Sequence, residues 1–146
     1  MCLVDNYTES CPGPSHGVPA CADRELLTSV LRTQWGFDGY VISDASAIKF
    51  IETDHEWAES QPEAAADAII AGADMALGGG CDPHNSPPGC ISFGALNESL
   101  QQGLAAISDI DRAVSRVLSV RFRLGEFVSP TPPPPAPAPY PLPNLL

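Results

Sequence analysis

Positively charged side chains are scarce in this sequence of 146 residues. Seven Lys and Arg residues stand against eighteen Asp and Glu residues, and the formal net charge is −11 at pH 7. Nucleic acids and anionic membrane surfaces are bound through clustered Lys and Arg side chains, which replace counterions at the phosphate groups. The composition therefore argues against a nucleic acid or a membrane as partner and leaves neutral or cationic ligands.

Long hydrophobic runs are also lacking. Gly or Asp interrupts every apolar stretch well before the roughly 20 residues that span a bilayer. The first thirty residues have no basic start followed by an apolar core, so no secretion signal is evident. Five cysteines (Cys2, Cys11, Cys21, Cys81 and Cys90) and two glycosylation patterns, at Asn6 and Asn97, are nevertheless typical of an extracellular protein. We therefore expect a chain that has lost its true N-terminus.

The C-terminal segment has a composition of its own. Residues 128–146 contain nine of the sixteen prolines and no charged side chain. Such a segment has too little to bury and populates extended polyproline II conformations. We expect a disordered Pro-rich tail there and a packed domain over residues 1–127. The tail is interpreted as a spacer, with a ligand for a Pro-binding domain or a wall-anchoring tract as the alternative.

The middle of the chain predicts a β-α-β unit. Residues 40–42 and 73–77 are short apolar runs that suit buried parallel strands. Between them, an acidic loop over residues 52–63 leads to a helix that Pro62 opens and Gly72 ends. A complete α/β barrel of roughly 250 residues does not fit in this chain.

Three more helices and one strand are predicted around this unit. A helix capped by Asp23 and ended by Gly36 precedes it, and a short strand over residues 1–5 begins the chain. A short helix covers residues 96–102. The last helix starts at Ser108, with Asp111 completing a capping box, and Gly125 ends it. Its predicted buried stripe is Ile110, Ala113, Val114, Val117, Leu118 and Phe122.

Asp44 is the leading candidate for a catalytic side chain. It follows the predicted strand over residues 40–42, and α/β folds place their ligands at the carboxyl ends of parallel strands. An Asp directly after a strand can also serve only to cap the next helix. The pattern by itself leaves both interpretations open.

The sequence resembles glycoside hydrolase family 3 over residues 1 to about 127. Residues 35–44 (WGFDGYVISD) are similar to the strand that carries the catalytic nucleophile in that family. Further matching segments follow in the family's order: residues 1–2 (MC), 17–22 (GVPACA), 25–27 (ELL), 62–66 (PEAAA), 71–75 (AGADM), 110–114 (IDRAV) and 121–125 (RFRLG).

The resemblance implies the C-terminal portion of the family's N-terminal (β/α)8 barrel domain, of the α/β class. It implies a retaining exo-β-glycosidase with Asp44 as nucleophile, closest to the β-xylosidase and α-arabinofuranosidase branch and acting on β-linked xylo-oligosaccharides or related glycosides. A second carboxyl, about 5 Å away, protonates the leaving oxygen in such chemistry. In the family this acid/base comes from a following domain, and other sugar-binding residues lie on earlier strands. We therefore expect the isolated chain to be an inactive fragment.

Three other residues are candidates for sugar binding. Trp57, in the acidic loop, can stack on a sugar face. His55 lies where the family often has a histidine-rich loop, although a surface histidine is the simpler interpretation. Val4 replaces a tyrosine of the xylosidase branch, and Tyr7 is a candidate to compensate. The acidic residues of the loop are otherwise interpreted as a solvated rim.

The cysteines have two interpretations. The resemblance suggests a disulfide between Cys2 and Cys21, and Cys81 with Cys90 could close the loop between them. Zinc held by Cys81, His84 and Cys90 is the competing interpretation, but a structural zinc site needs a fourth ligand. No metal or other cofactor is expected. By family the protein is placed outside the cell or in the cell wall.

A second function class remains open at this point. The chain is a glycosidase fragment, or it is a non-catalytic wall-associated or carbohydrate-binding remnant that its Pro-rich tail attaches. Loss of the family tyrosine favours the second interpretation, and the specific match around Asp44 favours the first.

Overall fold

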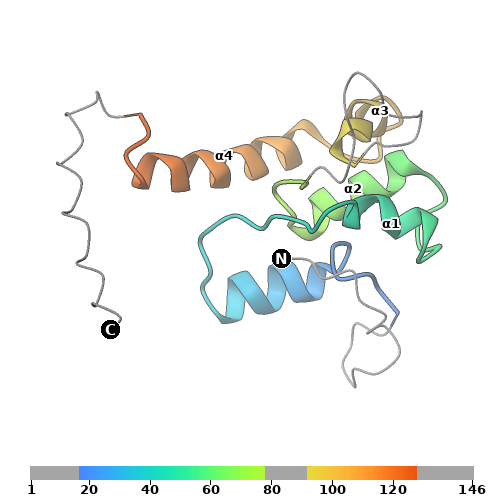
Figure 1. The fold of residues 1–146 in the computed structure, drawn as a ribbon, viewed down its shortest axis with the longest axis horizontal. Coiled ribbons are helices and arrows are strands. Elements are labelled where there is room, and N and C mark those ends of the chain that lie inside the picture. The colour runs from blue at the N-terminus through green and yellow to red at the C-terminus, as the bar shows by residue number, and fades with distance from the viewer. Residues whose placement is uncertain (1–16, 78–91, 128–146) are drawn as a thin grey trace, which may run out of the picture.

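The computed structural model describes residues 17–77 and 92–127. Within these ranges the chain forms a π-helix, a 3-10 helix and four α-helices (Figure 1). In chain order they are η2 (Glu25–Gln34), α1 (Ala47–Thr53), α2 (Gln61–Ala71), η3 (Phe93–Ala95), α3 (Leu96–Gln101) and α4 (Ile107–Arg123). No helix in the described ranges has the length and apolar character needed to cross a membrane. The predicted strand over residues 1–5 lies outside them.

The predicted helix after Asp23 is confirmed in its position, and its hydrogen bonds are those of a π-helix. The Asp23 carboxylate accepts a hydrogen bond from the Leu26 amide at 3.0 Å, as a capping residue does. At the other end the Trp35 amide bonds to the Val30 carbonyl, five residues back, so η2 is a π-helix. Gly36 follows in the left-handed region, with φ +70°, and ends it.

The helix predicted from Pro62 is confirmed as α2. The Ser60 hydroxyl accepts from the Glu63 amide at 3.4 Å, and Pro62 lies in the first turn, where a missing amide costs nothing. Gly72 ends the helix with φ +122°. The Thr28 hydroxyl of η2 donates to the Ala71 carbonyl at 2.7 Å, which fixes η2 against the end of α2.

In the described ranges the two predicted strands are joined by a short parallel bridge, Ile42 to Met75. The Ser43 amide donates to the Met75 carbonyl at 2.9 Å, and the Met75 amide donates to the Val41 carbonyl at 3.1 Å. The predicted parallel direction is therefore correct, whereas the predicted strand lengths are wrong. Strands extend by pairing on both sides, and no third strand flanks this pair within the described ranges. The described part is mostly helical rather than evenly α/β.

The acidic loop predicted over residues 52–63 begins later in the structure than predicted. Residues before Asp54 belong to α1, which buries Ile48 and Ile51 completely. These two side chains are three residues apart, a helical spacing that places both on one face. The loop proper is therefore confined to the turn between α1 and α2.

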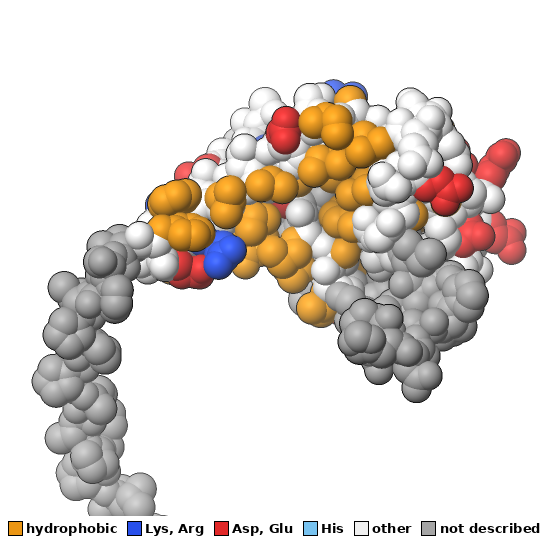
Figure 2. All heavy atoms as spheres, turned by 90° about the horizontal axis from the view of Figure 1, so that it is seen from above, with side chains coloured by type: hydrophobic (Ala, Val, Ile, Leu, Met, Phe, Trp, Pro, Cys, Tyr) orange, Lys and Arg blue, Asp and Glu red, His pale blue; other side chains and the backbone are white. Residues whose placement is uncertain are grey.

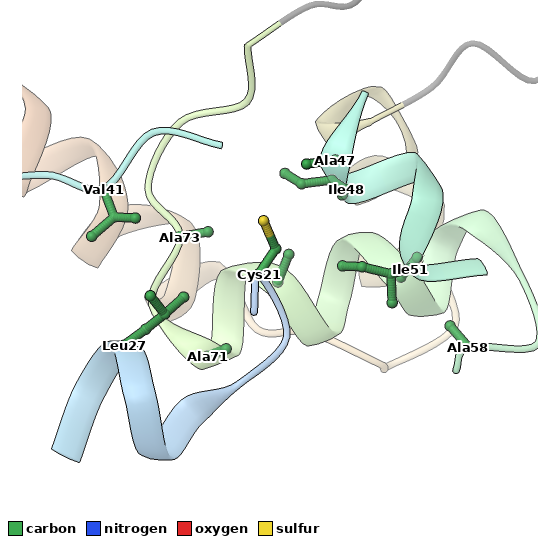
Figure 3. Close-up of a cluster of buried hydrophobic side chains, with 11 residues drawn as sticks. Cys21, Leu27, Val41, Ala47, Ile48, Ile51, Ala58, Ala71 and Ala73 are labelled. Atoms are coloured by element: carbon green, nitrogen blue, oxygen red, sulfur yellow. The ribbon is translucent and has the colours of Figure 1, made fainter. Parts of the chain in front are cut away.

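The core lies between η2, α1 and α2 and is rich in alanine (Figure 3). Small side chains let helices and turns approach closely, but each buries little apolar surface. The buried cluster consists of Cys21, Leu27, Val41, Ala47, Ile48, Ile51, Ala58, Ala64, Ala68, Ala71 and Ala73.

Helix α4 contradicts the predicted capping box and part of the predicted buried stripe. It begins at Ile107, and the Asp109 carboxylate accepts from the Ala106 amide at 3.0 Å, so Ser108 and Asp111 form no box. Within the stripe only Ala113 is buried, whereas Val114 is 48% and Phe122 is 61% exposed. Figure 2, which looks onto the side that carries α4 in Figure 1, shows hydrophobic side chains gathered along this surface.

Arginines explain the orientation of α4. Arg112, Arg116 and Arg123 are spaced four and seven residues apart, so they share one helical face. Arg112 donates to the Ile69 carbonyl at 3.1 Å, and Arg116 and Arg123 pair with Asp74 and Asp38, each at 2.8 Å. These contacts hold the arginine face against the rest of the chain, which leaves part of the apolar stripe exposed.

Asp74 is the most connected of the buried polar residues. Its side chain is 1% exposed and accepts from Arg32 at 2.6 Å, from Arg116 at 2.8 Å and from the Val41 amide at 2.8 Å. Arg32 also donates to the Gly39 carbonyl at 2.8 Å. Burial lowers the pKa of Arg32, and the adjacent Asp74 carboxylate opposes that change. One carboxylate thus joins η2, α4 and both segments of the parallel bridge.

Replacing Asp74 tests this arrangement. Asp74→Asn leaves the largely buried guanidinium of Arg32 and the half-buried guanidinium of Arg116 without a countercharge, so the free energy of unfolding should fall by about 3 kcal/mol or more. The matched control is Asp38→Asn, which breaks the exposed pair with Arg123 and should cost below about 1 kcal/mol. Urea unfolding followed by circular dichroism measures both. Equal losses would contradict a central role for Asp74.

Candidate functional site

Asp44 directly follows the parallel bridge, and hydrogen bonds fix the backbone that leads to it. The Ser43 hydroxyl accepts from the Leu77 amide at 3.1 Å and donates to the Asp44 carbonyl at 2.9 Å. Ser43 itself is buried. Together with the Ser43–Met75 backbone bond, these contacts hold residue 44 at the carboxyl end of the paired segments, where the sequence predicts a functional carboxylate.

A tight turn separates Asp44 from α1. The Asp44 carbonyl accepts from the Ala47 amide at 3.2 Å, and Ser46 between them has φ +60°. Non-glycine residues rarely occupy this left-handed region, and such conformations are frequent at functional sites. The turn reverses the chain immediately after the carboxylate.

The capping interpretation of Asp44 is not supported. Its Oδ1 accepts from the Ala45 amide at 2.7 Å, which lies before α1, and Ser46 occupies the N-cap position without a side-chain cap bond. Among the described residues, no hydrogen bond or ion pair is made by Oδ2. The carboxylate is half-buried, and the backbone orients one of its oxygens.

The other predicted sugar-binding residues lie after α1 in the chain or outside the residues that the structure describes. The backbone amides of His55 and Trp57 bond to the carbonyls of Phe50 and Ile51, both within α1. In the described ranges no hydrogen bond or ion pair joins either residue to Asp44. Tyr7 lies outside these ranges. The roles of His55, Trp57 and Tyr7 in sugar binding therefore stay predictions.

Trp57 has a contact that sequence reasoning missed. Its indole lies beside the carboxylate of Asp67 on α2, and its side chain remains 47% exposed. Burial raises the pKa of Asp67, the nearby Glu63 carboxylate raises it further, and the polar indole edge of Trp57 opposes both. The two residues are ten positions apart and come from different elements, so no periodicity links them in the sequence. Part of the indole ring is accessible.

The predicted cysteine chemistry lies mostly outside the description. Cys21 is buried in the core cluster, whereas Cys2, Cys11, Cys81 and Cys90 fall outside the described ranges, as does His84. Both disulfides and the competing zinc site therefore stay predictions. Among the residues that are described, no three His, Cys, Asp or Glu side chains gather where they could hold a metal ion.

The glycosylation pattern at Asn97 overlaps a structural contact. Asn97 is exposed on α3, but the Ser99 hydroxyl is fully buried, at 2.6 Å from the Pro62 carbonyl and 3.0 Å from the Ala95 carbonyl. Ser99 therefore ties α3 to the first turn of α2. This contact gives Ser99 a role in folding that is independent of any glycan.

A family model matches most of the chain. The model of the glycosyl hydrolase family 3 N terminal domain matches residues 8–120. This range includes Asp44, α1, α2 and most of α4.

Curated relatives are β-xylosidases. A probable β-D-xylosidase 7 of Arabidopsis thaliana is 38% identical over 112 residues, which cover 77% of this chain and 13% of that protein. The exo-1,4-β-xylosidase bxlB of Emericella nidulans is 39% identical over 115 residues, covering 77% of this chain and 14% of that protein. The chain thus spans about one seventh of the length of these relatives.

Solved structures show the same similarity in three dimensions. An exo-β-xylosidase (XlnD) in complex with a xylobiose aziridine activity-based probe superposes with a TM-score of 0.65 at 29% identity, covering 80% of this chain and 14% of that chain. A β-glucosidase of Erythrobacter marinus superposes with a TM-score of 0.64 at 36% identity, covering 78% and 14%.

The pKa of Asp67 generates a prediction about pH. Because the raised pKa belongs to the folded state, the folded chain binds this proton more tightly, and stability falls as pH rises from the ordinary Asp range through the raised value. Asp67→Asn removes this ionisation. The variant should be more stable than the parent chain at pH 7 but not at about pH 3, below the ordinary range.

Urea midpoints at the two pH values measure the effect. Asp111→Asn, on the exposed side of α4, is the matched control for losing one negative charge. An advantage of Asp67→Asn that is equal at both pH values, or equal to that of the control, would contradict the assignment.

Proposed function

Because the chain belongs to glycosyl hydrolase family 3, we propose that it supplies Asp44 as the catalytic nucleophile of a retaining exo-β-glycosidase. The proposed substrates are β-linked xylo-oligosaccharides or related glycosides, since the curated relatives above are named as β-xylosidases. The observation that carries the proposal is the position of Asp44, at the carboxyl end of the parallel pair and directly before a strained turn.

The proposed reaction uses the two Asp44 oxygens differently. Oδ1 is held by the Ala45 amide, which orients the carboxylate. Oδ2 attacks the anomeric carbon of the sugar, the glycosidic C–O bond breaks, and the leaving oxygen takes a proton from a second carboxyl group. Water then hydrolyses the glycosyl ester and gives its proton to that second group. Configuration at the anomeric carbon is retained because it is inverted twice.

We further propose that residues 1–127 form the C-terminal part of a (β/α)8 barrel domain and that residues 128–146 form a separate tail. The short parallel bridge supports this, because additional strands would extend it. The exposed apolar side chains of α4 also support it, because the additional strands would cover them. The second carboxyl and further sugar contacts would come from the remaining barrel and a following domain. The isolated chain is then inactive.

Trp57 and His55 are proposed to contribute to sugar binding from the turn after α1. The Trp57 side chain is 47% exposed, which suits a ring that stacks on a sugar. Tyr7 is proposed as a third contact. Extracellular or cell-wall placement and the Cys2–Cys21 and Cys81–Cys90 disulfides complete the proposal.

Activity measurements test the role of Asp44. The purified chain of 146 residues should not hydrolyse an aryl β-xyloside. A longer polypeptide that contains it should do so, and Asp44→Asn should lower its kcat by at least about 10³-fold, because the nucleophile is lost. Asp54→Asn, ten residues further along in the same acidic region, is the matched control and should leave kcat nearly unchanged.

Two results would overturn the proposal. Hydrolysis by the monomeric 146-residue chain would show that no second domain is needed. Full activity of Asp44→Asn in the longer polypeptide would move the nucleophile elsewhere and favour a non-catalytic, carbohydrate-binding role for this segment.

A further inference from the structure

An open apolar groove of about 300 Å³ lies between η2 and the segment that follows it. Its floor is formed by Leu27 and Val41, which belong to the buried core and lie close together at one edge of it (Figure 3). Leu26, Trp35 and Phe37 line it as well and are exposed, Trp35 by 73%. The groove therefore opens the edge of the core to solvent, which is unfavourable unless something covers it.

The groove has the chemistry that recognises proline. Trp35, Phe37 and Tyr40 give it three aromatic side chains, and grooves lined by aromatic rings bind proline-rich segments in the polyproline II conformation. Such segments carry backbone carbonyls but few N–H groups. The Trp35 indole N–H and the Tyr40 hydroxyl can donate to these carbonyls. Neither group has a hydrogen-bond partner among the described residues.

The end of α4 lies beside this groove. Arg123 donates to the Asp38 carboxylate at 2.8 Å and to the Asp38 carbonyl at 3.4 Å. Asp38 follows Phe37, and the Arg32 guanidinium lies 5.6 Å from the centre of the Phe37 ring. The C-terminal end of α4 and the segment after η2 lie on the same side of the molecule (Figure 1). The Pro-rich segment begins five residues after Arg123.

We propose that residues 128–146 of the same chain occupy this groove, as an intramolecular proline-rich ligand. The segment has nine prolines and no charged side chain, which matches a groove lined by uncharged side chains. At about 3.1 Å per residue, nineteen residues reach roughly 60 Å, far more than a groove beside Asp38 requires. A tethered segment has an effective concentration in the millimolar range, which suffices for weak proline recognition. This role does not depend on the proposed glycosidase activity.

Fluorescence quenching of Trp35 tests the proposal in the full chain. Trp57→Phe leaves Trp35 as the single tryptophan. In this background, acrylamide quenching is compared between the native tail and a tail in which all nine prolines are replaced by serine. The native tail should lower the quenching constant of Trp35 by about half, because proline rings cover the indole. Both chains keep the packed body unchanged, which circular dichroism verifies.

The matched control carries Trp35→Phe and reports Trp57, which lies in the turn after α1 and does not line the groove. Its quenching should not respond to the tail. Equal quenching of Trp35 with native and serine tails would overturn the proposal and indicate another occupant, such as a further part of the barrel. A protection of Trp35 that grows with protein concentration would also overturn it, since the tail would then act between copies.

Discussion

The buried carboxylate of Asp74 is the contact on which the rest of this structure depends. It binds Arg32 of η2, Arg116 of α4 and the Val41 amide, so three segments distant in sequence meet at one side chain. Val41 begins the short paired segment that Asp44 directly follows. The position of the proposed nucleophile is therefore set from its amino-terminal side by Asp74 and from the other side by the turn at Ser46. A buried charge without its partners would be strongly unfavourable, so the arrangement is specific.

The structure depends on polar contacts because the apolar core is small. Most of its helical positions are alanines, which allow close approach but bury little surface. Helix α4 is attached through Arg112, Arg116 and Arg123 and leaves Phe122 exposed. A domain held in this way has apolar surface to offer, at the stripe of α4 and at the aromatic groove beside η2. The stripe of α4 is suited to contact the rest of the proposed barrel, and the groove beside η2 is suited to the proposed binding of the tail.

The sequence predicted the features that local chemistry determines. Asp23, Pro62 and Gly72 mark helix ends because a side-chain oxygen, a missing amide and a positive φ act within a few residues. Strand length was overpredicted because it depends on neighbouring strands, which residues 40–42 and 73–77 lack within the described ranges. The helical period of the apolar stripe on α4 was predicted correctly, but the exposure of part of the stripe was not. The partners of the α4 arginines are distant in sequence, and they set the rotation of the helix. The proximity of Trp57 to Asp67 and the groove beside η2 left no sequence signal for the same reason.

Covalent labelling of the native polypeptide tests the central claim most directly. The polypeptide that carries this segment would be captured from its source cells with an antibody to residues 23–44, treated with a xylobiose aziridine probe and digested for mass spectrometry. The account predicts a polypeptide well above 15.3 kDa with a single glycosyl adduct on Asp44. An adduct on another carboxylate, or a native mass near 15.3 kDa with no adduct, would contradict it.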